Sequence, residues 1–153
     1  MTSHCTDHDV EQLLDRIDGS GSDEEWKAVF ELRSRLGENL PDRLLSRYRL
    51  AKQWSVRSSC VYHAVRYAKA SDTAVELALL AIKDKAKVVR YRACMLLACS
   101  QRKGLLPRLQ DLIANTPEDT KADVLAAIDA IESQNQDYFV DRDHSGMTTL
   151  TVH

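Results

Sequence analysis

The stretch Val88–Ala98 (VVRYRACMLLA) decides how this chain folds. Its apolar positions 89, 93, 96 and 97 recur at the 3.6-residue spacing of one helical face, which predicts an amphipathic helix. The stretch before it, residues 74–82, would be apolar over more than half of its circumference as a helix. A helix this apolar needs neighbours on two sides, and a stacked array of helices provides them.

Similar patterns on both sides of this pair predict further helices. Ser22, Ser55, Ser71 and Thr116 each precede an amphipathic segment and are expected N-caps. Pro41 suits the first turn of another helix. The expected helices cover residues 9–17, 22–36, 40–51, 55–67, 71–84, 88–100, 104–113 and 116–131.

Equivalent residues recur along the middle of the chain. The pair Val56-Arg57 returns as Val89-Arg90, and apolar positions of the neighbouring helices match at similar steps. A period of about 30–35 residues with one helical hairpin per period is typical of helical-repeat proteins. We therefore predict an all-α fold of about four stacked hairpins.

Residues 72–100 resemble a HEAT or HEAT-like (armadillo-related) repeat. The resemblance rests on Asp84 between two helices, followed by Val89-Arg90, a small residue at Ala93 and the apolar pair Leu96-Leu97. It implies a short right-handed α-α superhelix, a HEAT-like solenoid. It implies a fold and not a function.

The resemblance is weaker over the wider range 40–131. Val56-Arg57 matches in the preceding unit, but Ala51 stands where the aspartate is expected. In the following unit Thr120-Lys121 replaces the Val-Arg pair, and only the spacing of the apolar residues still matches.

Three segments are expected. Residues 1–6 would be a flexible leader, residues 7–134 the HEAT-like domain, and residues 135–153 a C-terminal flap. Two β-type runs, 137–140 and 147–152, flank a polar turn in this segment and predict a β-like hairpin or an extended flap that closes the C-terminal end of the stack.

Charge is distributed unevenly along the chain. The net formal charge is −6 over residues 1–40, +11 over residues 41–110 and −7 over residues 111–153. The basic side chains of the middle segment are too numerous for the four acidic residues there to pair with. They predict a basic surface for an acidic partner.

Six residues are expected to contact this partner, mostly from the second helices of the hairpins: Arg57, Tyr62, Arg66, Arg92, Met95 and Trp54. For Arg57 and Arg90 the resemblance implies an alternative role. In that role each arginine binds an acid or a carbonyl between helices and connects neighbouring repeats.

Metal sites have little support in the sequence. Asp141, Asp143 and Ser145 match the first positions of a calcium loop, but the twelfth position, Val152, is not the glutamate that such a loop needs. A polar turn with Gly146 in the left-handed region is the favoured alternative. No cofactor is expected.

The sequence also offers no clear catalytic residue. His63 lies in a helix with no acid nearby in sequence to orient it as a base, and no catalytic motif is present.

The predicted function is therefore a non-catalytic binding module, such as an adaptor, an inhibitor or an immunity-type protein, for an acidic protein partner. A nucleic-acid-binding HEAT-like protein and a HEAT-like lyase are the alternatives. A cytoplasmic location is expected, because no secretory signal, membrane-spanning run or disulfide framework is apparent.

Overall fold

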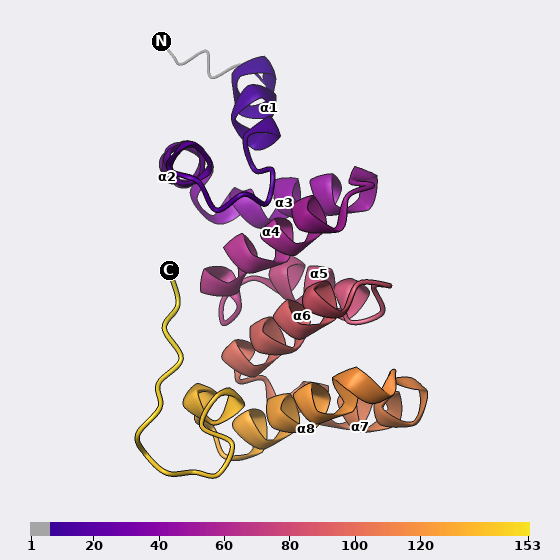
Figure 1. The fold of residues 1–153 in the computed structure, drawn as a ribbon. Coiled ribbons are helices and arrows are strands. Elements are labelled where there is room, and N and C mark those ends of the chain that lie inside the picture. Colours follow the sequence, from indigo (N-terminus) through magenta and orange to yellow (C-terminus); the bar gives the residue numbers. More distant parts are fainter. Residues whose placement is uncertain (1–6) are drawn as a thin grey trace.

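The computed structural model describes residues 7–153, so the leader expected at residues 1–6 lies outside the described residues. Within 7–153 the chain is all-α and contains no strand. The helices are α1 (Asp7–Asp15), α2 (Asp23–Leu36), α3 (Leu40–Leu50), α4 (Trp54–Ala64), α5 (Asp72–Ala81), α6 (Lys87–Ser100), α7 (Leu106–Leu112) and α8 (Glu118–Glu132), with short 3-10 turns between some of them (Figure 1).

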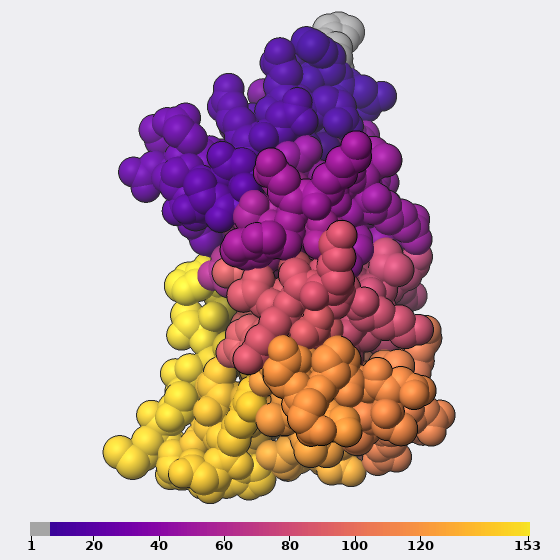
Figure 2. Space-filling view, turned by 45° about the vertical axis from the view of Figure 1, so that its right-hand side comes forward, coloured from indigo at the N-terminus to yellow at the C-terminus, as the bar shows by residue number. Residues whose placement is uncertain are grey.

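The helices from α3 onward form successive hairpins. The pairs α3–α4, α5–α6 and α7–α8 each pack together, and α6 also packs against both α4 and α8 (Figure 1). The layers follow one another in chain order along the molecule (Figure 2). Leu96 and Leu97 of α6 are fully buried, as their place in the central layer requires.

Two of the predicted N-caps are confirmed and two are wrong. The hydroxyls of Ser22 and Ser71 accept backbone N–H groups from the third residue on, at 3.2 and 3.0 Å. Ser55 is not a cap, because α4 already begins at Trp54. The Thr116 hydroxyl instead donates to a carbonyl one turn earlier (2.6 Å).

Arg57 connects its own hairpin with the next one. It is 8% exposed, and its Nη1 donates to the Lys52 carbonyl in the α3–α4 turn (2.8 Å). Its Nε and Nη2 donate to the carboxylate of Asp84 in the α5–α6 turn, at 2.8 and 3.1 Å. The Tyr48 hydroxyl donates to the same carboxylate (2.5 Å).

Arg90, the counterpart of Arg57 in the next hairpin, also binds both its own hairpin and the next one. Its Nη1 donates to the Asp84 carbonyl in the turn of its own hairpin (2.8 Å). Its Nε and Nη2 donate to the Thr120 hydroxyl (2.8 Å) and the Asp119 carboxylate (3.0 Å), both at the start of α8. Both arginines therefore connect two layers of helices, as the resemblance implies, and the partner-binding role of Arg57 stays a prediction.

A second pair of equivalent residues lies at the opposite ends of these helices. Gln101 and Gln134, which follow α6 and α8, both have left-handed backbones (φ 54° and 53°). The Gln101 side chain donates to the Ala130 carbonyl (3.0 Å), and the Gln134 side chain donates to the Gln101 carbonyl (3.2 Å). Both bonds hold the C-terminal ends of α6 and α8 together.

The predicted C-terminal β-like hairpin is wrong. Residues Gln136–Phe139 form a 3-10 turn, and residues 147–153 are extended without a strand partner. Phe139 is fully buried and its ring lies 5.3 Å from that of Tyr91 in α6. Aromatic and β-branched residues suggested a strand here. In the folded chain this segment packs against the last helices instead.

Three cysteines lie in the described chain, Cys60, Cys94 and Cys99, and all are free and buried. Burial raises the pKa of each thiol to about 12. None of the helices in residues 7–153 is long and apolar enough to cross a membrane.

Candidate functional site: a cationic and aromatic face

Three arginines from successive parts of the chain share one surface and lack an acidic partner. Arg33 lies in α2, Arg66 in the turn after α4, and Arg92 in α6. Most other arginines of the described chain are paired with an Asp or Glu, but none of these three has such a carboxylate within 4.0 Å in residues 7–153. They are a group of guanidinium charges without a direct ion pair to an Asp or Glu side chain of residues 7–153.

Each of these arginines lies against an aromatic ring. The Arg92 guanidinium carbon is 4.6 Å from the centre of the Tyr62 ring, and that of Arg66 is 5.8 Å from the Tyr67 ring. The Arg33 carbon lies 5.8 and 5.2 Å from the rings of two aromatic residues in α2. These are distances at which a cation is attracted to a ring face. We call this surface the cationic–aromatic face; it comprises Trp26, Phe30, Arg33, Tyr62, Arg66 and Arg92.

Burial affects the charges on this face. It lowers the pKa of Arg92, and it lowers that of Arg33 together with the positive charge of Arg66. An arginine nevertheless stays protonated at neutral pH. The face therefore holds cations that are partly removed from water, and an arriving anion would stabilise them.

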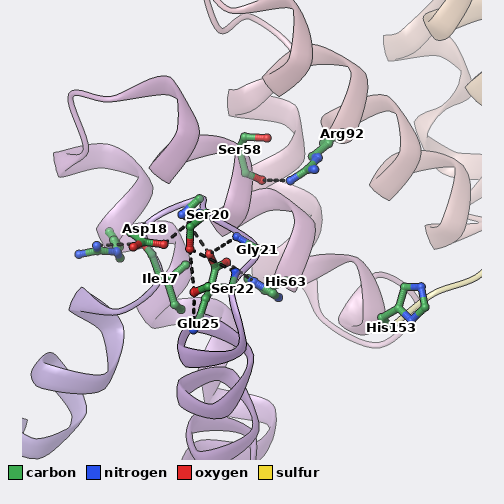
Figure 3. Close-up of polar contacts among 12 residues, drawn as sticks. Ile17, Asp18, Ser20, Gly21, Ser22, Glu25, Ser58, His63, Arg92 and His153 are labelled. Carbon is green, nitrogen blue, oxygen red and sulfur yellow. Dashed lines mark hydrogen bonds and ion pairs between the residues drawn. The ribbon is translucent and has the colours of Figure 1, made fainter.

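A buried acid–histidine pair holds α2, which carries part of the face, against α4. His63 Nε2 lies 2.7 Å from Glu25 Oε2, and both side chains are almost completely buried (Figure 3). The other oxygen of Glu25 accepts the N–H groups of Gly19 and Gly21, each at 3.1 Å. Burial raises the pKa of Glu25, but the bonds from His63, Gly21 and Ser59 outweigh it and leave that pKa below its ordinary value.

This pair gives His63 an acidic partner, although no acid lies near it in the sequence. The partner is Glu25, 38 residues earlier in the chain. The second ring nitrogen, Nδ1, is buried and has no hydrogen-bond partner. The pair therefore holds α2 and α4 in position.

A cavity of about 290 Å³ lies beside this pair, at the edge of the cationic–aromatic face. Its lining includes Gly19, Trp26, Tyr62 and Arg92. The Arg92 guanidinium makes only a long bond to the Ser58 carbonyl (3.5 Å), so most of its donors are available there (Figure 3).

Not all residues predicted to bind the partner belong to this face. Tyr62, Arg66 and Arg92 do, whereas Met95 is buried in the core. Trp54 is 56% exposed, but it begins α4 and so lies about 12 Å along the helix from Tyr62.

The polar loop near the C-terminus is closed by its own backbone. Asp141 Oδ1 accepts the Ser145 N–H (3.0 Å) and hydroxyl (2.6 Å), and its Oδ2 accepts the Gly146 N–H (2.7 Å). The Ser145 hydroxyl is the main cause of the lowered pKa of Asp141. Gly146 has the predicted left-handed backbone (φ 79°). Asp143 is exposed, and residues 7–153 contain no cluster of three metal-binding side chains.

Sequence reasoning missed the contribution of α2 to the face. Trp26, Phe30 and Arg33 lie at positions i, i+4 and i+7, a spacing that places them on one side of a helix. That spacing is a readable signal, but the acidic character of the segment 1–40 favoured the basic middle segment as the binding surface.

Comparison with known proteins gives no further guide to this face. No family model matches the chain, and no curated protein matches it.

Proposed function

We propose that this protein is a non-catalytic binding module that presents its cationic–aromatic face to an acidic protein partner. The observation that carries the proposal is the grouping of Arg33, Arg66 and Arg92 on one aromatic surface without an Asp or Glu of residues 7–153 to pair with. A carboxylate on a partner would supply the missing acceptor, because guanidinium and carboxylate form strong, bidentate hydrogen bonds.

We further propose that the hairpins form a HEAT-like, right-handed α-α superhelix. The support is the similarity of Arg57 and Arg90, each of which binds a carbonyl in the turn of its own hairpin and side chains of the next hairpin. In such an array the second helices of successive hairpins line one side. Tyr62 in α4 and Arg92 in α6 would then come from equivalent layers of the binding surface.

The composition of the face favours a protein partner. Arginine, tryptophan and tyrosine are the residues most often found where binding energy is concentrated in protein interfaces. The acidic segments at both ends of the chain, with net charges of −6 and −7, would oppose a long polyanion. The cytoplasm remains the proposed compartment, and the three free thiols are consistent with it.

Single-stranded nucleic acid is the second candidate. The observation that favours it is the alternation of rings and arginines, since bases stack on aromatic side chains while arginines contact phosphates. The test of function therefore includes a nuclease-treated arm.

Reversing two charges on the face should abolish partner capture. We expect Arg66→Glu/Arg92→Glu to weaken binding by at least thirtyfold, since residues of this kind each contribute about 2 kcal/mol at interface centres. The measurement is affinity capture from lysate with the wild-type chain and the variant, in which acidic proteins are quantified by mass spectrometry with and without nuclease.

The matched control is Lys83→Glu/Lys85→Glu, which makes the same charge change at two lysines near the α5–α6 turn. It should keep the captured proteins. Equal loss in both variants would show that net charge alone is responsible, and loss after nuclease treatment would favour the nucleic-acid candidate.

A further inference from the structure

The extended C-terminal segment Met147–His153 returns from the last helices to the first ones. It rises from the α8 end of the molecule toward α2 (Figure 1). Its middle is anchored beside α8, where the Leu150 N–H donates to the Asp137 carboxylate (2.9 Å) and the Leu150 side chain packs against the core.

The end of this segment lies on the cationic–aromatic face. Arg33 Nη2 donates to the backbone oxygen of His153 (2.7 Å) across 120 residues of chain. The His153 ring meets the Trp26 ring edge-on, with their centres 6.3 Å apart. Two of the six residues of the face are therefore already in contact with the protein's own chain.

We propose that Met147–His153 is a strap that occupies the α2 part of the face, and that the acidic partner binds there as an extended segment that displaces it. This inference rests on the proposed function. It adds that the partner binds as an extended segment and that the strap competes with it for the same site. The strap shows the backbone shape that this part of the face accepts: an extended chain with an oxygen at Arg33 and a ring at Trp26.

The strap leaves Arg33 incompletely satisfied. Its Nε is buried and has no acceptor, while a single oxygen of the strap binds Nη2. A carboxylate side chain at this position would accept from Nε and Nη2 together, as the parallel arrangement of these donors allows.

The strap is also held loosely along its length. Within residues 147–153 every residue except Leu150 is exposed, and Met147 is 88% exposed. Segments with few buried contacts open at low free-energy cost. Displacement of the strap therefore requires the release of little more than the Leu150 anchor and the Arg33 contact.

The test uses the full chain and a short fluorescein-labelled peptide rich in glutamate, with a glutamine peptide of the same length for comparison. We expect Leu150→Ser to bind the glutamate peptide about three to ten times more tightly than the wild type, because a larger fraction of molecules has an open face. Met147→Ser removes an exposed apolar side chain from the same strap and should leave the affinity unchanged. Fluorescence anisotropy gives both values.

A second readout follows the strap itself. Saturating glutamate peptide should accelerate amide hydrogen exchange at Leu150, measured by NMR, because the N–H loses its bond to Asp137. Two contrary results are binding of the peptide with no gain in affinity from Leu150→Ser, and binding with unchanged amide exchange at Leu150. Either result would show that the strap does not compete with the peptide, and the proposed function would stand without it.

Two other outcomes are equally decisive. Absence of peptide binding to all three chains would overturn the proposed function and the strap with it. Equal affinity for the glutamine peptide would overturn the role assigned to the carboxylate.

Discussion

Replacing Asp84 by alanine should lower the free energy of unfolding by about 3–5 kcal/mol, because it leaves the buried Arg57 guanidinium without its carboxylate. Asp84 accepts two bonds from Arg57, one from the Tyr48 hydroxyl and one from the Ala86 N–H. These contacts join two successive hairpins. Urea unfolding followed by circular dichroism measures the loss.

Glu76→Ala is the matched control, because Glu76 also pairs with an arginine of a neighbouring hairpin, Arg49, but both side chains are exposed. It should cost no more than about 1 kcal/mol. Equal losses in the two variants would contradict the assignment of Asp84 as a buried connector.

The Asp84→Ala variant should also be less sensitive to acid than the wild type. Burial raises the pKa of Asp84, but hydrogen bonds from Arg57, Tyr48 and Ala86 outweigh it, so the pKa lies below the ordinary value of 3.8. A carboxyl group whose pKa is lower in the folded than in the unfolded state stabilises the fold. This stabilisation is complete above the pKa of the unfolded state and is lost as the pH falls through the pKa of the folded state. Stability below about pH 4 should therefore fall less steeply in Asp84→Ala than in the wild type.

Replacing Glu25 by alanine should also cost about 3–5 kcal/mol, since it removes the partner of a buried histidine and the acceptor of two N–H groups. The loop containing Gly19 and Gly21 would lose its anchor, and α2 would be released from His63. Denaturant unfolding at neutral pH measures the change in stability, and anisotropy with the glutamate peptide measures the effect on the face.

The neighbouring Glu24 provides the control, because it differs from Glu25 chiefly in being exposed. Glu24→Ala should change stability by less than about 0.5 kcal/mol. Should Glu25→Ala unfold at the same urea concentration as Glu24→Ala, the buried pair contributes nothing measurable to the position of α2.

The local pattern of apolar residues was sufficient to predict the helices. Ser22 and Ser71 begin helices where their hydroxyls can accept N–H groups, and Leu96 and Leu97 are buried because they lie on the apolar face of α6. The resemblance to a HEAT-like repeat implied a connecting role for Arg57 and Arg90, and both arginines bind groups in two layers of helices. These features depend on neighbours close in sequence or on a fixed period.

What the sequence could not indicate depends on contacts between distant residues. Glu25 and His63 meet because the fold brings α2 beside α4, and the sequence around each residue gives no indication of the other. Phe139 belongs to a segment with β-type composition, but residues 7–153 offer it no second strand, and its ring packs beside Tyr91 instead. Arg33 was hidden within an acidic segment, and only the fold brings it to the face.

The most direct measurement of the central claim is the affinity of the glutamate peptide for two triple variants with the same loss of charge. In Arg33→Gln/Arg66→Gln/Arg92→Gln the unpaired arginines of the face are neutralised. In Arg43→Gln/Arg49→Gln/Arg102→Gln three arginines that already pair with exposed acids are neutralised instead. The first variant should lose binding and the second should keep it within about twofold. Equal affinities for the two variants would contradict the assignment of the face as the binding surface.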